Sequence, residues 1–124
     1  MRLRESIAAA RRGDPIQNAG GEMEFEFQFG ADDPTFAGHF PGRPILPGVF
    51  QLELTRVAAE SVLKCSLSIR EIRKAKFQRP ILPEETVRLA LKLSEHGGTI
   101  QARAGFSVGG EPAGETVLVL WRSN

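Results

Sequence analysis

The fold is constrained most by one helix-length apolar segment in a chain that otherwise alternates apolar and polar residues. Over Val49–Lys64, apolar side chains lie around most of the circumference of a helix, which is typical of a core helix. Before this segment, Glu22–Phe29 alternates without interruption and predicts a strand with one buried face. The period of two returns after the helix. We therefore expect an α+β domain in which a curved antiparallel sheet wraps the helix.

Recognisable turns separate the remaining strands. Arg79–Glu84 and Gly109–Gly114 are expected to turn the chain, and Gly97–Gly98 predicts a hairpin. The first strand after the helix is expected to contain an irregularity near Glu71 and Ile72. The four strands are expected at residues 67–78, 86–93, 100–108 and 117–122.

Length and composition indicate one soluble domain over residues 1–124. The chain is 41% hydrophobic and carries a formal net charge of +1, as expected of a single globular domain. The core of such a small domain is limited, so we expect a homo-oligomer in which a partner subunit helps to complete it. Cys65 is the only cysteine, and no segment approaches the roughly 20 apolar residues of a membrane span, which favours a cytoplasmic location. Met1–Arg12 is too weakly apolar for a secretory signal and is expected to form a short amphipathic helix or arm.

The segment between the first strand and the helix is expected to be an ordered loop. Residues 30–47 contain four prolines, a density at which neither a helix nor a strand keeps its backbone hydrogen bonds. Phe40 and Ile45 need burial, which distinguishes this segment from a polar, flexible linker. His39 therefore lies in a frame of prolines and glycines just before the helix.

Glu53 lies near the start of the predicted helix, with Val49 and Val57 four residues to either side. An acid on an apolar face loses solvation, which raises its pKa and favours a protonated carboxyl that can donate a proton. A histidine such as His39 needs no such environment to act as a base near neutral pH. The alternatives are a loop histidine without a chemical role and a glutamate in a salt bridge with Arg56.

Gly48 offers a third group. If the helix begins there, its free backbone N–H groups and positive dipole end can bind a carbonyl oxygen that becomes negative as an enolate forms. A glycine also lets a substrate approach the backbone closely. A base, an acid and such an amide are suited to adding or removing water across a pair of carbon atoms.

Two segments resemble the 3-hydroxyacyl-[acyl-carrier-protein] dehydratases of bacterial fatty-acid synthesis. Within that family, the resemblance is closer to the FabZ branch than to the FabA branch. The first is Asp33–Val49 (DPTFAGHFPGRPILPGV), which is similar to the family's active-site segment. Glu53 follows His39 by fourteen positions, the spacing between the family's histidine and acid, and it is Glu as in FabZ rather than the Asp of FabA. The second is Lys76–Pro83, which is similar to the strand and turn that follow the family's helix.

The resemblance implies a hotdog fold, a long helix wrapped by an antiparallel sheet, assembled as a homodimer or a trimer of dimers. Each site would combine two chains, with His39 of one subunit facing Glu53 of the other. The implied reaction converts 3-hydroxyacyl-[acyl-carrier-protein] to the trans-2-enoyl thioester. In it His39 removes the α-proton, Glu53 protonates the departing hydroxyl and the Gly48 amide binds the thioester carbonyl. The same segment implies further substrate-binding residues, namely Phe40, Pro47, Val49 and Val57.

The chain departs from the family pattern in three places. The Pro-His-Arg-containing segment that usually precedes the first strand is not recognisable before Gly21, which bears on hexamer formation and tunnel shape. Val57 stands where FabZ usually has Gln, so a hydrogen bond to the acid is expected to be missing. The chain has no Tyr, so the tyrosine that gates the acyl tunnel in some relatives must be replaced, by Phe or Leu. These departures indicate a specialised or divergent member.

A cluster of basic residues lies between the helix and the following turn. Such a cluster can steer an acidic partner, and acyl carrier protein is acidic; a solvated strand face explains it equally well. Nucleic acid is not expected, because the net charge is only +1 and no binding motif accompanies the cluster. The sequence has neither metal-ligand spacing nor a glycine-rich phosphate loop, so we expect no metal and no cofactor. The cluster consists of Arg70, Arg73, Lys74, Lys76 and Arg79.

Two other functions would use the same fold. A hotdog acyl thioesterase also carries a carboxylate on its helix but hydrolyses the thioester, and it would not need His39 within His-Phe-Pro-Gly. A non-catalytic acyl-thioester-binding module would keep the fold without the chemistry. Val57 and the altered N-terminal segment are the features that favour the module.

Overall fold

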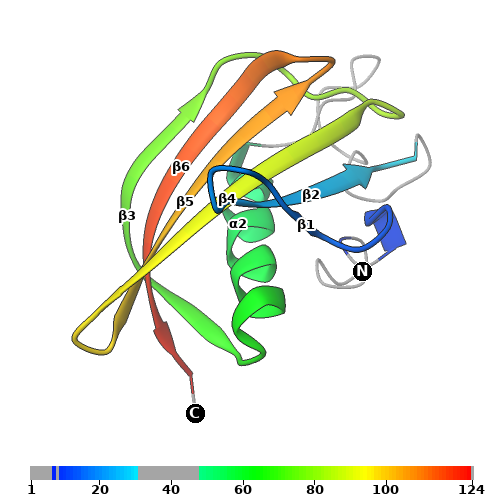
Figure 1. Ribbon diagram of the computed structural model, residues 1–124. Coiled ribbons are helices and arrows are strands. Elements are labelled where there is room, and N and C mark those ends of the chain that lie inside the picture. Colours follow the sequence, from blue (N-terminus) through cyan, green and yellow to red (C-terminus); the bar gives the residue numbers. More distant parts are fainter. Residues whose placement is uncertain (1–6, 8, 31–47, 124) are drawn as a thin grey trace.

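A curved antiparallel sheet surrounds one long helix, α2 (Gly48–Leu63), as Figure 1 shows. The computed structural model describes residues 7, 9–30 and 48–123. The sheet has the strand order β1-β2-β4-β5-β6-β3, and every neighbouring pair is antiparallel. This is the predicted α+β class and the hotdog fold. The strands are β1 (Ile16–Gln17), β2 (Met23–Gln28), β3 (Leu67–Phe77), β4 (Thr86–His96), β5 (Thr99–Val108) and β6 (Glu111–Arg122).

One face of α2 fills the concave side of the sheet. Phe50, Leu54 and Ala58 are buried at intervals of four residues, the spacing of a single helical face. Through this face α2 contacts β3, β4, β5 and β6. The helix ends at Leu63, and the next residue, Lys64, has a left-handed φ of 58° that turns the chain towards β3.

Polar side chains share this buried face. The Thr55 hydroxyl donates to the Gln51 carbonyl at 2.9 Å and pairs with the Thr116 hydroxyl on β6 at 2.7 Å, so two fully buried hydroxyls are satisfied. Gln51 is 2% exposed, and its Oε1 has no hydrogen-bond partner within the described residues. This oxygen lies 2.4 Å from the place where a Cβ atom on Gly114 would be. Gly114 thus makes room for Gln51.

β6 begins earlier than predicted. Only the two glycines that start the predicted turn over Gly109–Gly114 reverse the chain, with φ of 58° and 84°, and β6 already starts at Glu111. Pro112 is accommodated because β5 and β6 shift register beside it, between Phe106 and Ser107. The prediction of a last strand confined to residues 117–122 is therefore wrong.

The predicted helix and the other predicted strands are confirmed to within a few residues. The predicted ordered loop lies outside the described residues from position 31 to 47, as does most of the predicted N-terminal helix or arm, and both stay predictions. The irregularity in β3 is present as register shifts between Ile69 and Glu71 and between Ile72 and Lys74. Gly97–Gly98 forms the predicted hairpin, with φ of 54° and 88°. The short strand β1 is not predicted, because both of its residues are exposed and leave no alternating pattern. None of the helices among the described residues is both long and apolar enough to cross a bilayer.

We expect Gly114→Ala to lower the free energy of unfolding by about 1–3 kcal/mol, the usual effect of overpacking a core. The added Cβ would lie 2.4 Å from Gln51 Oε1 and 2.9 Å from the Lys76 carbonyl oxygen. Urea unfolding followed by circular dichroism measures the change. Gly105→Ala is the matched control, because no atom lies within 4 Å of its Cβ position, and it should not lower stability. Equal losses in both variants would contradict the packing explanation.

Candidate functional site

Four of the seven predicted site residues lie on α2, within the described part of the chain. Gly48 is the first residue of the helix. Val49, Glu53 and Val57 follow at intervals of four and share one helical face. The pairing of the histidine with Glu53 stays a prediction. Outside the described residues lie His39, Phe40 and Pro47.

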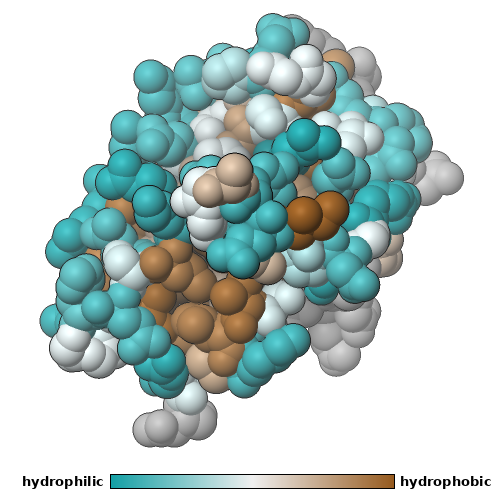
Figure 2. Space-filling model, in the orientation of Figure 1, coloured by the Kyte–Doolittle hydropathy of each residue, from teal (hydrophilic) through white to brown (hydrophobic). Residues whose placement is uncertain are grey.

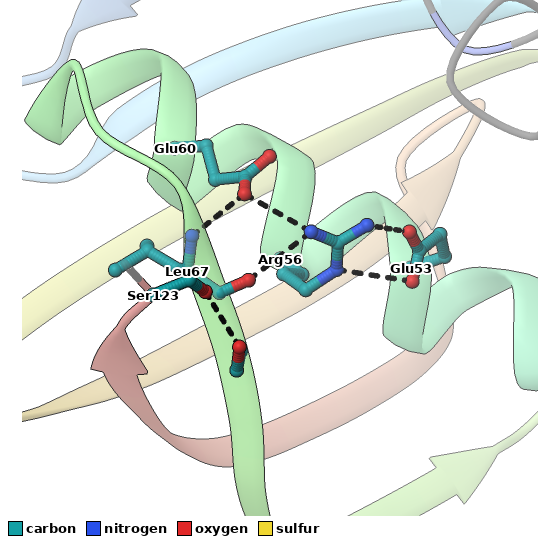
Figure 3. Close-up of polar contacts among 6 residues, drawn as sticks. Glu53, Arg56, Glu60, Leu67 and Ser123 are labelled. Carbon is teal, nitrogen blue, oxygen red and sulfur yellow. Dashed lines mark hydrogen bonds and ion pairs between the residues drawn. The ribbon is translucent and has the colours of Figure 1, made fainter.

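Glu53 is held by Arg56, one turn further along α2 (Figure 3). Arg56 Nε donates to Glu53 Oε2 at 3.2 Å, and Arg56 Nη2 donates to Glu53 Oε1. The side chains of Glu53 and Arg56 are 20% and 13% exposed. Glu53 therefore does not lie among apolar side chains alone, since Val49 on the preceding turn is 69% exposed and a cation occupies the following turn. The salt bridge with Arg56, the alternative to an apolar environment, is present.

The same guanidinium is anchored on its other side. Arg56 Nη1 donates to Glu60 Oε2 at 3.0 Å and to the Leu67 carbonyl at 3.2 Å. Glu60 Oε2 also accepts the Leu67 N–H at 2.7 Å. Because Leu67 is the first residue of β3, these bonds tie the helix to the strand that follows it, as Figure 3 shows.

Among the described residues, no group of three or more His, Cys, Asp or Glu side chains is placed to hold a metal ion.

Arg56 enters the sequence prediction only as an alternative partner for Glu53. The signal for its larger role is its spacing, three residues after Glu53 and four before Glu60. Side chains three and four apart are neighbours on a helix surface, so one arginine can reach both carboxylates.

Gly48 is packed against an aromatic ring. A Cβ atom on Gly48 would lie 2.6 Å from Phe77 Cε2 and 2.7 Å from Phe77 Cδ2. The glycine therefore makes room for Phe77, and the contact of its backbone with a substrate stays a prediction. Phe77 ends β3 and is 45% exposed. The first turn of α2 contains no acidic side chain, so its positive dipole end is not compensated from within that turn.

A cavity of about 270 Å³ lies beside Val57, between α2 and β2. Val57 and Ser61 continue the line of Glu53 at intervals of four, so the cavity follows the face of α2 that carries Glu53. Arg11 is one of the residues that line the cavity, and its guanidinium carbon lies 5.8 Å from the centre of the Phe25 ring. Figure 2 shows an apolar patch over the C-terminal half of α2. The cavity is lined by Ile7, Arg11, Phe25, Phe27, Val57, Ala58 and Ser61.

Three of the five residues of the predicted basic cluster, Arg73, Lys74 and Arg79, lie within 4 Å of a carboxylate. Lys74 Nζ lies 2.6 Å from Glu115 Oε1, and its hydrogen bond lowers the pKa of the Glu115 carboxyl. Arg79 Nη2 lies 2.8 Å from Glu85 Oε2. These contacts reduce the net positive charge that the cluster presents to an acidic partner.

Comparisons with known proteins point to dehydratases. The family model called ApeI-like, described as ApeI dehydratase, matches residues 15–111. The 3-hydroxyacyl-[acyl-carrier-protein] dehydratase FabZ of Pelotomaculum thermopropionicum is 35% identical over 97 residues, which cover 72% of this chain and 69% of that protein. A chain of the dehydratase heterocomplex ApeI:P from Xenorhabdus doucetiae is 28% identical, with a TM-score of 0.73 over 88% of this chain and 95% of that chain. A probable thioesterase from Bartonella henselae shares the fold, with 14% identity and a TM-score of 0.66 over 83% of this chain and 90% of that chain.

Proposed function

The chain belongs to the ApeI-like dehydratase family, and we propose that it removes water from 3-hydroxyacyl thioesters carried by acyl carrier protein. The product is the trans-2-enoyl thioester. The observation that carries this proposal is the acid on the central helix of a hotdog fold, Glu53, fourteen residues after the histidine of a FabZ-type segment. The likeness to thioesterases of low identity concerns the fold alone.

In the proposed reaction His39 removes a proton from the α-carbon of the substrate. The electrons of that C–H bond form the Cα–Cβ double bond, the Cβ–O bond breaks, and Glu53 donates a proton to the departing hydroxyl, which leaves as water. Each oxygen of a carboxyl group has more than one acceptor site, so a Glu53 bonded to Arg56 keeps room for the substrate. The backbone of Gly48 binds the thioester carbonyl while it carries negative charge.

The acyl tail is proposed to occupy the cavity beside Val57. This cavity follows the face of α2 that carries Glu53, and most of its lining is apolar, as a hydrocarbon chain requires. A substrate whose reacting carbons lie at Glu53 would extend along Val57 towards Ser61, about 12 Å further along the helix axis.

We further propose a cytoplasmic homodimer in which His39 of one protomer meets Glu53 of its partner. Within the described residues β3 has β6 as its only neighbour in the sheet, so its other edge is open to pairing. Large apolar side chains are also exposed near β3 and the start of α2, and such patches mark protein interfaces. They are Val49 at 69%, Ile72 at 49% and Phe77 at 45% exposure.

We expect His39→Ala and Glu53→Gln each to lower the rate of dehydration of 3-hydroxybutyryl thioesters by about 10²-fold or more, as for loss of a general acid or base. Enoyl absorbance and release of free thiol are followed together, also with crotonyl thioester. Thiol release without a change in enoyl absorbance would indicate the thioesterase. Ligand binding without turnover at any chain length would indicate the binding module, and full activity in both variants would contradict the site assignment.

We expect Val57→Phe to shorten the acyl chain that the enzyme accepts. The larger ring would fill part of the cavity, so kcat/KM for a twelve-carbon substrate should fall by about 10-fold or more relative to a four-carbon substrate. Ile16→Phe, at a position that is 71% exposed on β1, is the control and should leave the ratio unchanged. An unchanged ratio in Val57→Phe would place the tail elsewhere.

We expect the protein to sediment at twice the 13.6 kDa mass of the chain, and Ile72→Lys to sediment as a monomer. A charge at this apolar position would have to be desolvated in the interface. Because the proposed site combines two chains, the monomeric variant should lose dehydratase activity as well. A monomeric Ile72→Lys with full activity would contradict the shared site.

A further inference from the structure

We propose that Arg56 is a positioning residue for the dehydration: it fixes the Glu53 carboxylate in the orientation in which that group exchanges a proton with the substrate. Because this role acts through Glu53, it rests on the proposed function. Arg56 itself would touch no reacting atom.

The contact between the two side chains sets both position and plane. Arg56 reaches one oxygen of Glu53 through Nε and the other through Nη2. Two parallel bonds from a planar guanidinium hold a carboxylate more rigidly than a single bond does. The carboxylate of Glu53 cannot rotate about its last C–C bond without losing one of them. A lysine at this position would supply one point contact and leave that rotation free.

Arg56 is itself held by groups other than Glu53. Its third nitrogen, Nη1, bonds to Glu60 and to the Leu67 carbonyl, and the side chains of Arg56 and Glu60 are only 13% and 9% exposed. Since Leu67 belongs to β3, the guanidinium is fixed by the helix and the sheet together. The anchor therefore exists independently of the group that it positions.

A proton donor on a helix surface needs such an anchor. The carboxyl must come within about 2.6–3.2 Å of the substrate oxygen, and a misplacement of about 1 Å can lower a rate about 10²-fold. The hydrogen bond expected to be missing because position 57 is Val is supplied here from position 56.

The test compares the wild-type protein with Arg56→Met, Arg56→Lys, Glu53→Gln and the double variant Glu53→Gln/Arg56→Met. We expect Arg56→Met to lower kcat about 10²-fold with KM within about threefold of the wild-type value. Arg56→Lys should lie between the two, because it keeps the charge and one donor. In the double variant Arg56→Met should cause no further loss, since non-additivity is the signature of two residues that act as one unit.

Arg88→Met is the matched control. It removes an arginine that is paired with a glutamate on the sheet, Arg88 Nη2 to Glu26 Oε1 at 2.8 Å, and should leave kcat unchanged. Circular dichroism and sedimentation establish that each variant is folded and assembled; should Arg56→Met fail to fold, the more conservative Arg56→Lys with its Glu53→Gln double variant decides.

Three results would overturn the positioning role. They are a folded Arg56→Met or Arg56→Lys with kcat within about twofold of wild type, a loss confined to KM, and additive losses in the double variant. With an active wild type and an inactive Glu53→Gln, these results leave the proposed function standing. A wild-type protein without dehydratase activity overturns the proposed function and the positioning role together.

Discussion

The structure depends on the burial of one face of α2 in the curve of the sheet. Phe50 and Leu54 are almost completely buried on this face, and each such side chain contributes about 1.5–3 kcal/mol. The same helix carries Glu53 and Arg56 on another face, so the packing that stabilises the fold also orients the acid. Because interiors are densely packed, α2 has little freedom to turn about its axis. The direction in which Glu53 leaves the helix is thus set by residues that take no part in the chemistry.

Periodicity predicts the helix and most strands correctly because burial on one face imposes the same period on sequence and structure. Periodicity does not predict where β6 starts. Pro112 and Gly114 are turn signals in the sequence, yet both lie within a strand. Gly114 is required there by the side chain of Gln51, which is distant in the sequence, and Pro112 is tolerated because β6 shifts register against β5. Tertiary contacts override local propensity at both positions, and a one-dimensional pattern does not encode them.

The candidate site, like the fold, is predictable from the sequence only in part. The spacing of Glu53 from His39 is readable in the sequence and carries the likeness to the dehydratases. The pairing of Glu53 with Arg56 follows from helical spacing. The anchoring of Arg56 does not, because it requires the chain to return after Lys64 and bring Leu67 back against the helix. The proposed meeting of His39 with Glu53 of a second chain would depend on the packing of subunits, which neither periodicity nor spacing specifies.

Fold and chemistry are separable in this architecture. A probable thioesterase with 14% identity shares the fold, so the fold by itself does not decide between hydrolysis of a thioester and loss of water from the β-carbon. Hydrolysis needs one group to activate water, whereas dehydration needs a base at the α-carbon and an acid at the β-oxygen. An acid clamped by Arg56 supplies only one of the two. Dehydration therefore requires a second proton-transfer group besides Glu53. His39 is the residue that the sequence offers for this role, because it lies in the family segment at the family spacing from Glu53.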